Sequence, residues 1–436
     1  MHRQITIIGA GLAGCEAAWQ LAQKGFKVNL LEQKPLARTP AQKSDHLAEL
    51  VCSNSLRSAD PENAVGLLKQ EMRSLNSLII QMADRHRIPG GSALVVDREG
   101  FSEGITEAIK KHPHIKVGSV AVTAIPSDRP LVIATGPLTT PAFAQAIQSL
   151  TATNYLYFYD SIAPIVEVDS INREIAFKAS RYDKGEADYL NCPMTKEEYE
   201  TFVNELISSE KVPAKDFEKE IYFEGCLPIE VMAARGLKTL AFGPMKPVGL
   251  TDPRTCMRPY AVVQLRQDDL HASLYNMVGF QTRMKYPEQM RVFRKVPGLE
   301  NAQFVRLGSM HRNTYINSPQ LLNPYLELKN HPGIYFAGQI CGVEGYVESA
   351  AMGLYVGQVL GARLQNRDPD FLSTRTGLGA LVRHITEASS RGFQPMNVNF
   401  GLFEIAEAER KKISRKELVE GSLKMVSSWQ QQLWNL

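Results

Sequence analysis

The sequence contains no apolar run that approaches the roughly 20 residues of a membrane-spanning helix, so no membrane association is expected. Its six cysteines include no C-x-x-C pair, which argues against a zinc site and a disulfide framework, and no metal is predicted. The first residues, MHRQITIIGAG, enter a predicted strand at once, so no signal peptide is expected. Together these absences favour a cytoplasmic protein.

The chain also lacks a strong charge of either sign. Its formal net charge is +3 over 436 residues, which neither predicts nor opposes a nucleic-acid partner. No internal repeat or low-complexity linker is apparent. With 44% hydrophobic and 22% charged residues, the composition is that of a globular protein, and the length suffices for two or three domains.

A nucleotide-binding motif is present at the N-terminus, in ITIIGAGLAGCEAAWQLAQKGFKVNLLEQ. A strand over 5–8, a helix over 13–24 and a second strand over 27–31 are predicted around a G-x-G-x-x-G turn. The glycines suit a tight turn, the close approach of a pyrophosphate and helix–strand packing, and the acid after the second strand suits a ribose 2′-OH. The predicted dinucleotide-binding residues are Gly9, Ala10, Gly11, Leu12, Ala13, Gly14 and Glu32.

Two later segments bear on which dinucleotide binds. PLVIATG (130–136) reads as a strand entering a turn, and HPGIYFAGQICGVEGYVESAAMGLYVGQVLG (331–361) reads as a strand, a glycine-rich loop and a helix. The second segment can offer helix N-terminal N–H groups to the far end of an extended dinucleotide, which favours FAD. The segment is explained equally well as a further strand–helix unit of the same sheet. No second G-x-G-x-x-G is present, so a dedicated NAD(P) domain is not predicted.

Two cysteines are candidates for reactive thiols. Cys226, in FEGCLPIEVMAARG, precedes Pro228, which favours a helix start nearby and would place the thiol at the positive end of that helix. Cys52, in LAELVCSNSLRS, precedes Ser53–Ser55, which indicate a cap or turn. The alternative for both is a buried packing thiol, because free cysteine is commonly buried.

Seven motifs together resemble one family. They are GAGLAGCEAA, LVCSNSLRS, FYDSIAPIV, FEGCLPIEVMA, GPMKPVGL, LYNMVGFQT and GIYFAGQICGVEGYVESAAMG. Over nearly the whole chain, the sequence resembles the folate- and FAD-dependent tRNA (uracil-5-)-methyltransferases, relatives of the glucose-inhibited division protein A family. Gln339, where many flavoproteins have an acid, matches this family.

The resemblance implies an α/β fold: a Rossmann-like FAD/NAD(P)-binding domain with an inserted α/β domain and a helical C-terminal segment. Residues 1–149 and 298–372 are expected to form the FAD-binding domain, and residues 150–297 the insertion. Residues 373–436 are expected to be helical and to pack on the FAD domain. Within the insertion, TKEEYETFVNELI is predicted as a helix and AVVQLR as a strand.

The resemblance also implies a reaction. A one-carbon unit passes from methylenetetrahydrofolate to C5 of a uracil in tRNA, at T-loop uridine 54, giving 5-methyluridine. Reduced FAD supplies the hydride and NAD(P)H is the reductant. The implied catalytic residues are Cys226 and Cys52, because a thiolate that adds to uracil C6 makes C5 nucleophilic. Cys52 is implied as the partner thiol, either the base for the C5 proton or an alternative nucleophile. His311 and Tyr346 are implied beside the flavin and the folate pterin, and Gly338 and Gln339 in the late flavin loop.

The RNA-binding surface is the least defined part of the interpretation. The stretch Gln281–Pro297 carries five basic residues against one acid, a net +4 that can follow a phosphate backbone. A second basic run near residues 410–416 has acidic neighbours and reads better as a solvated helix face. Lys246 and Arg283 are weaker candidates for folate carboxylates or phosphates.

Four other functions remain open at this point. The same chemistry could act on a ribosomal RNA uridine, or the chain could be a wobble-uridine-modifying flavoprotein. A small-molecule flavin oxidoreductase would use the FAD fold without needing two activated thiols. An RNA-binding protein with structural FAD would keep its RNA affinity after both cysteines are replaced.

Overall fold

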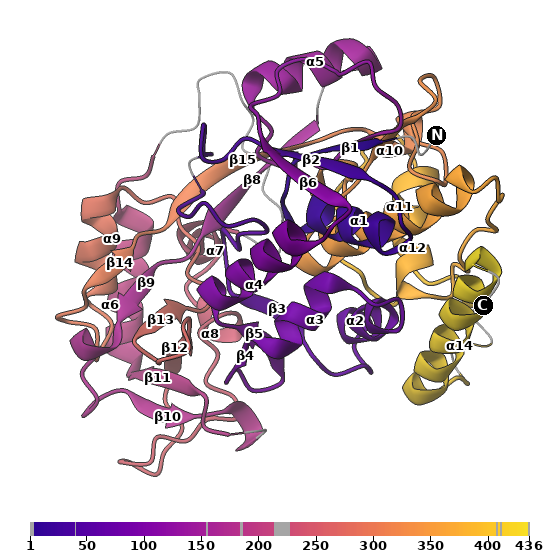
Figure 1. The fold of residues 1–436 in the computed structure, drawn as a ribbon. Coiled ribbons are helices and arrows are strands. Elements are labelled where there is room, and N and C mark those ends of the chain that lie inside the picture. Colours follow the sequence, from indigo (N-terminus) through magenta and orange to yellow (C-terminus); the bar gives the residue numbers. More distant parts are fainter. Residues whose placement is uncertain are drawn as a thin grey trace.

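The structure is a computed structural model that describes residues 4–39, 41–153, 156–183, 186–212, 227–406, 409 and 412–434. Only the backbone is described for residues 156–161, 183, 311 and 312. The described residues form two units with separate hydrophobic cores (Figure 1). The parallel-sheet unit draws its core from residues 5–147 and 315–434, and the antiparallel-sheet unit from residues 166–302. Along the chain, the second core is therefore inserted within the first.

The parallel-sheet unit is built on five strands in the order β16-β7-β1-β2-β6, and all of their pairings are parallel. The central strand consists wholly of buried residues, as expected for a parallel strand covered on both faces. The predicted strand over 5–8 is confirmed, and the second strand begins one residue later than predicted. The strands are β1 (Ile5–Ile8), β2 (Val28–Glu32), β6 (Ile115–Ser119), β7 (Leu131–Ile133) and β16 (Ile334–Phe336).

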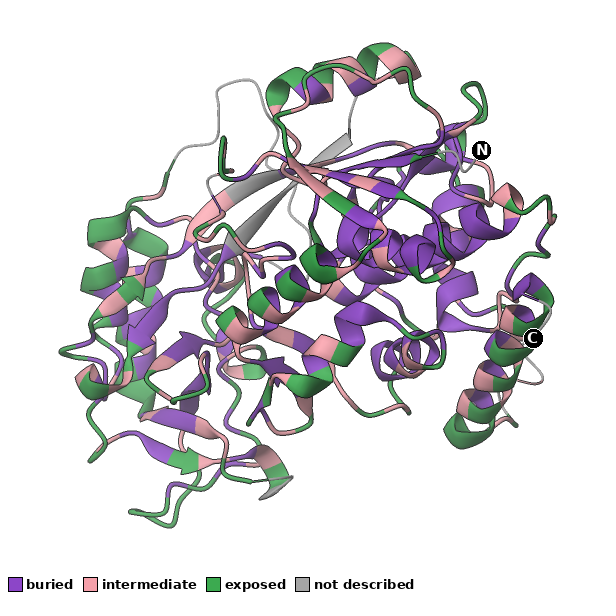
Figure 2. Ribbon diagram, viewed as in Figure 1, coloured by how far each residue is buried: buried purple, intermediate pink, exposed green. Residues whose placement is uncertain are grey.

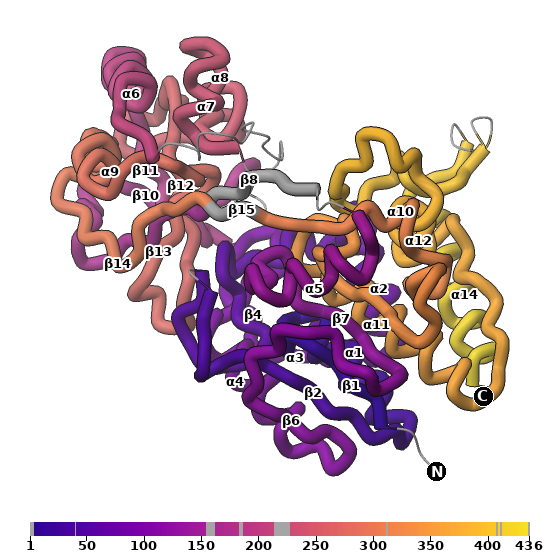
Figure 3. Tube along the Cα trace, turned by 90° about the horizontal axis from the view of Figure 1, so that it is seen from above, coloured from indigo at the N-terminus to yellow at the C-terminus, as the bar shows by residue number. Residues whose placement is uncertain are grey.

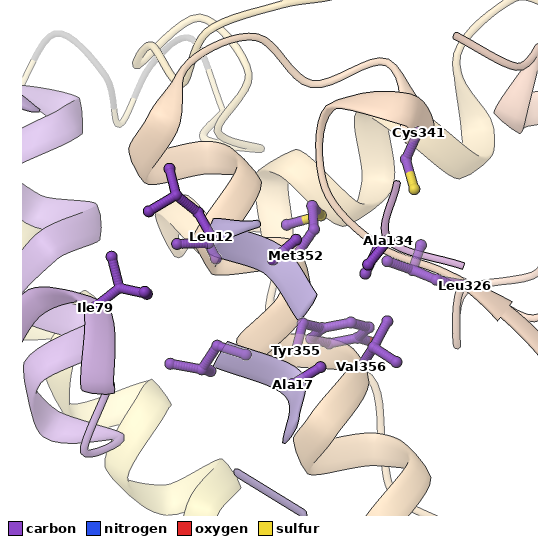
Figure 4. Close-up of a cluster of buried hydrophobic side chains, with 14 of the residues drawn as sticks. Leu12, Ala17, Ile79, Ala134, Leu326, Cys341, Met352, Tyr355 and Val356 are labelled. Carbon is purple, nitrogen blue, oxygen red and sulfur yellow. The ribbon is translucent and has the colours of Figure 1, made fainter. Parts of the chain in front are cut away.

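Two helices cross in close contact on one side of this sheet. They are α1 (Leu12–Gln23), within one residue of its prediction, and α11 (Tyr346–Leu364). Glycine is required at the crossing, because a Cβ on Gly353 would lie 2.1 Å from the Ala13 carbonyl oxygen. Leu12 and Ala17 of α1 and Met352, Tyr355 and Val356 of α11 belong to the buried cluster shown in Figure 4.

Four further helices and a small sheet complete the first half of this unit. Side-chain caps start two of the helices: Ser77 accepts from the Ile80 N–H, and Asp97 accepts from the Gly100 N–H. Ser55 begins a strand, so the predicted cap or turn over residues 53–55 does not lead into a helix. The elements are β3 (Ser55–Ser58), α2 (Ala64–Ser74), α3 (Leu78–Arg85), β4 (Arg87–Ile88), β5 (Ala93–Val96), α4 (Arg98–Lys111) and α5 (Pro141–Thr151).

The C-terminal helices pack back on this unit through a buried carboxylate. Glu71 of α2 accepts hydrogen bonds from the Gly377 and Leu378 N–H groups and from the Ser422 hydroxyl. Burial raises the pKa of this carboxyl group. The helices that contact Glu71 are α12 (Gly377–Glu387) and α14 (Arg415–Trp434). Helix α10 (Ser318–Leu321) packs against α12, and the short 3₁₀ turn η4 (Gln339–Cys341) precedes α11.

The antiparallel-sheet unit contains six strands in the order β10-β11-β12-β13-β9-β14. The predicted strand AVVQLR is confirmed as part of β12, which is buried along its whole length. The strands are β9 (Ile165–Glu167), β10 (Phe177–Ala179), β11 (Tyr189–Met194), β12 (Ala261–Gln267), β13 (Leu274–Met277) and β14 (Phe304–Arg306). Two 3₁₀ turns, η1 (Val168–Ser170) and η2 (Arg181–Asp183), lie between strands.

Four helices accompany this sheet. The predicted helix after residue 195 is confirmed, and Thr195 and Glu198 form a reciprocal capping box at its start. Phe202, Phe280 and Phe293 form a row of contacting rings in the core. The helices are α6 (Lys196–Ser208), α7 (Ile229–Ala234), α8 (Thr239–Phe242) and α9 (Tyr286–Phe293).

A two-stranded antiparallel ribbon connects the two units. The chain leaves the parallel-sheet unit along β8 (Leu156–Ile162) and returns along β15 (Ser309–Tyr315), with Leu156 opposite Tyr315. Figure 3 shows this ribbon between the units. Buried residues fill the interior of each unit, and exposed ones lie on the outer helices (Figure 2). Among the described residues, no helix combines the length and apolar character needed to cross a membrane.

Candidate functional site

The glycine-rich turn between β1 and α1 forms a cradle. A Cβ on Gly14 would lie 1.8 Å from the Gly9 carbonyl oxygen, so only glycine fits there. A Cβ on Gly9 would lie 2.6 Å from the Ala134 carbonyl oxygen, and Gly9 has a φ of +98°. A Cβ on Gly11 would meet no atom within 4 Å, and Gly11 lines a pocket. Two glycines thus satisfy the protein's own packing, while the third leaves room for a bound group.

Glu32 lies at the end of β2, where its carboxylate is held by the backbone. Oε2 accepts from the Ala10 N–H at 2.8 Å, and Oε1 accepts from the Lys34 N–H at 3.1 Å. Each carboxylate oxygen has a further lone pair. Because Glu32 also lines the pocket, an oriented acceptor faces any ligand that occupies it.

The pocket extends from this turn across the carboxyl ends of the parallel strands. Its empty volume is about 1060 Å³, which includes space open to solvent. A position outside the carboxyl ends of strands is where open α/β sheets bind ligands. Its wall combines the N-terminal turn, the loop after β7 and the start of α11, including Glu32, Gln33, Thr135, Gly136, Thr139, Gly338, Gln339, Tyr346 and Ser349.

The late loop between β16 and α11 forms one side of the pocket. Gly338 has a φ of +88°, and a Cβ there would lie 2.7 Å from the Ala13 Cβ. Gln339 donates from Nε2 to Glu344 Oε2 at 2.6 Å, and Glu344 is buried. The carboxylate therefore orients the amide of Gln339. Glu344 was not predicted from the sequence, although it lies only five residues away.

Cys52 belongs to residues Leu50–Asn54, named here the thiol loop, which lies against the start of α11. The Tyr346 hydroxyl oxygen accepts from the Cys52 N–H at 2.6 Å and from the Ser53 N–H at 3.1 Å. Burial raises the pKa of the Tyr346 phenol well above its usual range. Because Tyr346 also lines the pocket, one side chain connects the pocket wall to the candidate thiol.

Asn54 holds the thiol loop where the two units meet. It is fully buried, and its Nδ2 donates to the Val96 carbonyl at 3.1 Å and to the Gln267 carbonyl at 3.0 Å. Val96 lies in the parallel-sheet unit and Gln267 in the antiparallel-sheet unit. The position of the loop therefore depends on the docking of both units.

Three arginines from distant parts of the chain contact the thiol loop. They come from α4, β12 and β14, and the sequence analysis did not identify them. Asp268 accepts from Arg98 Nη2 at 2.8 Å and from its Nε at 3.3 Å. The contacts to the loop are Arg98 with the Leu50 carbonyl, Arg306 with the carbonyls of Val51 at 3.2 Å and Cys52 at 2.7 Å, and Arg266 with the Ser53 hydroxyl at 2.8 Å and Asn54 Oδ1 at 3.3 Å.

Two predicted site residues lie wholly or partly outside the described part of the structure. Cys226 lies outside the described residues, but the helix predicted after it is confirmed: α7 begins at Ile229, with Pro228 as its N-cap. His311 lies in β15, and its backbone pairs with Asp160 of β8. The side chain of His311 lies outside the described part of the structure. The structure therefore brings Cys52, Tyr346 and the pocket together without placing the Cys226 thiol or the His311 imidazole.

The other described cysteines differ in their exposure to solvent. Cys15, Cys192 and Cys341 are fully buried, as expected for packing residues. Burial raises the pKa of all three thiols, that of Cys192 to about 12. Cys256 is exposed. Among the described residues, no group of three or more His, Cys, Asp and Glu side chains is arranged to hold a metal, and the absence of a metal stays a prediction.

In the predicted basic stretch Gln281–Pro297, folding places carboxylates beside three of the five basic side chains, and its contact with RNA stays a prediction. Arg291 forms ion pairs with Glu205 and Glu288, and Lys295 pairs with Glu205 at 3.4 Å. Lys285 pairs with Glu210 at 2.7 Å. Two of these three carboxylates come from outside the stretch, so counting charges along the sequence did not include them. Lys246 is exposed, and the Arg283 N–H donates to Glu230.

Comparison with known proteins agrees with this geometry. A family model described as "Glucose inhibited division protein A" matches residues 4–368. The structure of Aquifex aeolicus GidA in its form II crystal superposes with a TM-score of 0.71 at 15% identity, covering 98% of this chain and 73% of that one, which shows a shared fold. The fold and the pocket thus define a protein of the glucose-inhibited division protein A class.

Two curated relatives narrow the class. One, from Heliobacterium modesticaldum, is 59% identical over 399 residues, covering 92% of this chain and 91% of the relative. Another, from Natranaerobius thermophilus, is 56% identical over 427 residues, covering 98% and 99%. Both are named methylenetetrahydrofolate--tRNA-(uracil-5-)-methyltransferase TrmFO. The chain belongs to the TrmFO family.

Proposed function

We propose that this chain transfers a one-carbon unit from methylenetetrahydrofolate to C5 of a uracil in tRNA. The T-loop uridine 54 is the proposed target and 5-methyluridine the product. Similarity to TrmFO enzymes over nearly the full length supports the reaction class. The structural observation that carries the proposal is Tyr346, which joins a dinucleotide-type pocket to the loop of a candidate catalytic thiol.

The pocket is the proposed FAD site, and the residues present fit this cofactor. The start of α1 offers N–H groups to a pyrophosphate, and the open space at Gly11 admits it. Glu32 is suited to a ribose hydroxyl, because its carboxylate is already oriented. Gly338 and Gln339 form the opposite wall. When bound, reduced FAD supplies the hydride that takes a formaldehyde-level carbon to a methyl group, and NAD(P)H is the proposed reductant.

Cys226 and Cys52 are the proposed catalytic residues. A thiolate that adds to C6 of uracil gives C5 the electron density to attack the folate methylene. The C5 proton must then leave, and a second thiolate can accept it before the first is expelled from C6. The start of α7 just after Cys226 favours that residue as the nucleophile. Cys52, beside the cofactor pocket, is the proposed base.

The remaining assignments follow from the same proposal. His311 and Tyr346 are the proposed contacts to the flavin and the folate pterin. The domain division 1–149, 150–297, 298–372 and 373–436 is proposed as well, supported by the two separate hydrophobic cores. The cytoplasm is the proposed location, since tRNA is the proposed substrate.

The direct test uses purified protein, unmodified tRNA transcript, NAD(P)H and methylenetetrahydrofolate labelled in its methylene carbon. The expected result is labelled 5-methyluridine, located at position 54 by nucleoside and fragment analysis. Parallel reactions contain S-adenosylmethionine as the donor or a ribosomal RNA fragment as the acceptor. Label that enters RNA only from S-adenosylmethionine, or only into ribosomal RNA, contradicts the proposal.

A further inference from the structure

The three arginines at the thiol loop carry more positive charge than their surroundings balance. Among the described residues, Asp268 is the one carboxylate that forms an ion pair with Arg98, Arg266 or Arg306. The other contacts of these arginines with the loop are neutral carbonyl, hydroxyl and amide oxygens. Counted over the described residues alone, three guanidinium groups and one paired carboxylate leave an excess of two positive charges around five residues of backbone.

This excess lies in a site that is buried in part, because Arg98, Arg306 and Cys52 are each partly exposed. Arg266 is 8% exposed, and burial lowers the pKa of both Arg266 and Arg306. Nε of Arg306 is buried and has no hydrogen-bond partner among the described residues. Buried charges are costly unless they are paired, so the site favours an anion beside the arginines.

The thiol loop itself contains a group that can become that anion. The guanidinium groups hydrogen-bond the backbone and side chains of residues 50–54 on both sides of Cys52. Burial is the largest influence on the pKa of each arginine, and a negative charge on Cys52 acts in the opposite direction. By reciprocity, the guanidinium groups stabilise the ionised thiol. Among the residues that the structure describes, Asp268 and Tyr346 are further titratable groups that face the loop. Asp268 and the Tyr346 phenol oppose ionisation by negative charge, and Tyr346 is neutral at physiological pH because burial raises its pKa.

We propose that Arg98, Arg266 and Arg306 are positioning residues that keep Cys52 in its thiolate form in the resting protein and hold it beside the cofactor pocket. Cys52 is then ready to accept the C5 proton without first losing its own. Accepting that proton returns Cys52 to a neutral thiol, so the step balances without an added reactant. The consequence for methyl transfer rests on the proposed function, but the ionisation of Cys52 does not.

The test measures alkylation of each cysteine by iodoacetamide between pH 5 and pH 9. It uses the full-length protein loaded with FAD, and peptide mass spectrometry separates the sites. Exposed Cys256 serves as the reference thiol within the same molecule. A free thiol has a pKa of about 8.5, so the rate at Cys256 is expected to fall about tenfold per pH unit in the acidic range. Cys52 is expected to keep its rate to at least one pH unit lower.

Substitutions at Arg306 separate electrostatics from loop structure. Arg306→Gln removes the charge but leaves an amide donor for the carbonyls of the loop, and the alkylation midpoint of Cys52 is expected to rise by about one pH unit or more. Arg306→Lys keeps the charge and is expected to retain most of the low-pH reactivity. Arg363→Gln, at the far end of α11, is the matched control and leaves the profile unchanged. Arg266→Lys against Arg266→Gln repeats the comparison if Arg306→Gln does not fold.

Two results would overturn the proposal. One is a wild-type Cys52 profile with the same midpoint as that of Cys256. The other is a folded Arg306→Gln protein that retains FAD and whose Cys52 profile does not move. Because the assay contains neither RNA nor folate, its outcome is independent of whether the chain methylates tRNA. A shifted Cys52 profile without methyl transfer would support the thiolate and contradict the proposed function.

Discussion

Two groups of basic side chains in this protein differ in how folding treats them. The stretch Gln281–Pro297 is basic in sequence, but Arg291, Lys285 and Lys295 are neutralised by carboxylates that folding brings alongside. The arginines of the thiol loop lie on three distant elements, and among the described residues only Arg98 of the three forms an ion pair, with Asp268. The comparison shows that a run of charge in sequence is an incomplete guide to the charge of the folded surface, because folding can place carboxylates beside it. The predictions below test that difference, beginning with the thiol that the second group surrounds.

Replacement of either proposed catalytic thiol is expected to have the largest effect. Cys52→Ala and Cys226→Ala should each lower methyl transfer by roughly three orders of magnitude or more while FAD stays bound. A packing thiol changed to alanine would instead cost roughly 1–2 kcal/mol of stability and leave turnover largely intact. The measurement is single-turnover methyl transfer, with 5-fluorouracil-substituted tRNA to accumulate a thiol adduct. Exposed Cys256→Ala is the control, and near-normal turnover in both variants would refute the two-thiol mechanism.

The buried ion pair Arg98–Asp268 is expected to matter more for stability than an exposed one. Arg98→Met leaves the Asp268 carboxylate, whose side chain is 4% exposed, without its partner. Such a loss costs about 3–5 kcal/mol, measured as the free energy of unfolding in urea. The double variant Arg98→Met/Asp268→Asn should recover much of that loss. A single variant as stable as the wild type would contradict the prediction that Asp268 depends on Arg98 to offset the cost of its burial.

Lys69 is a further buried basic residue, and its contribution to the free energy of unfolding depends on pH. It is fully buried and donates to the Leu56 carbonyl at 2.8 Å, and burial lowers its pKa from 10.5 to about 7. Between these pH values the unfolded chain binds a proton that the folded protein does not, so this group makes stability rise from pH 7 towards pH 10. Urea unfolding across that range should show this component in the wild type. Lys69→Met should remove it, and an identical pH dependence in the two proteins would contradict the assignment.

The exposed pairs of the basic stretch are expected to contribute little. Arg291→Gln should change the free energy of unfolding by no more than about 1 kcal/mol, even though Arg291 has two carboxylate partners. Moderate salt should reduce that small difference further. A loss of stability comparable with that of Arg98→Met would contradict the predicted difference between the exposed pairs and the buried pair.

RNA binding should respond least to the basic stretch. In Lys285→Gln/Lys295→Gln, the slope of the logarithm of tRNA affinity against the logarithm of salt concentration should stay unchanged, because both lysines already face carboxylates. A slope that falls by about one or two would show that the lysines exchange their partners for phosphates. That result would support this surface as an RNA contact.

Local sequence patterns predicted the structure well where residues that are neighbours in sequence are also neighbours in space. The β1 strand, the glycine turn and the approach of Glu32 all follow from about thirty consecutive residues, and the helix after Pro228 follows from proline's own geometry. The contact between Tyr346 and the Cys52 N–H spans 294 residues and could not be read from spacing. The three arginines could not be predicted from the sequence either, because their convergence depends on how α4, β12 and β14 pack and not on any motif.

The strand order has a consequence for synthesis of the chain. Edge strand β16 pairs with β7, but about 200 residues separate them along the chain, a span that takes roughly 10–40 s to translate at ~5–20 residues per second. During that time the inserted core is completed while β7 presents an unpaired edge, the kind of surface on which chains misassemble. Gly338 and Tyr346 follow β16, so the cofactor pocket is among the last parts of the protein to be completed as the chain leaves the ribosome.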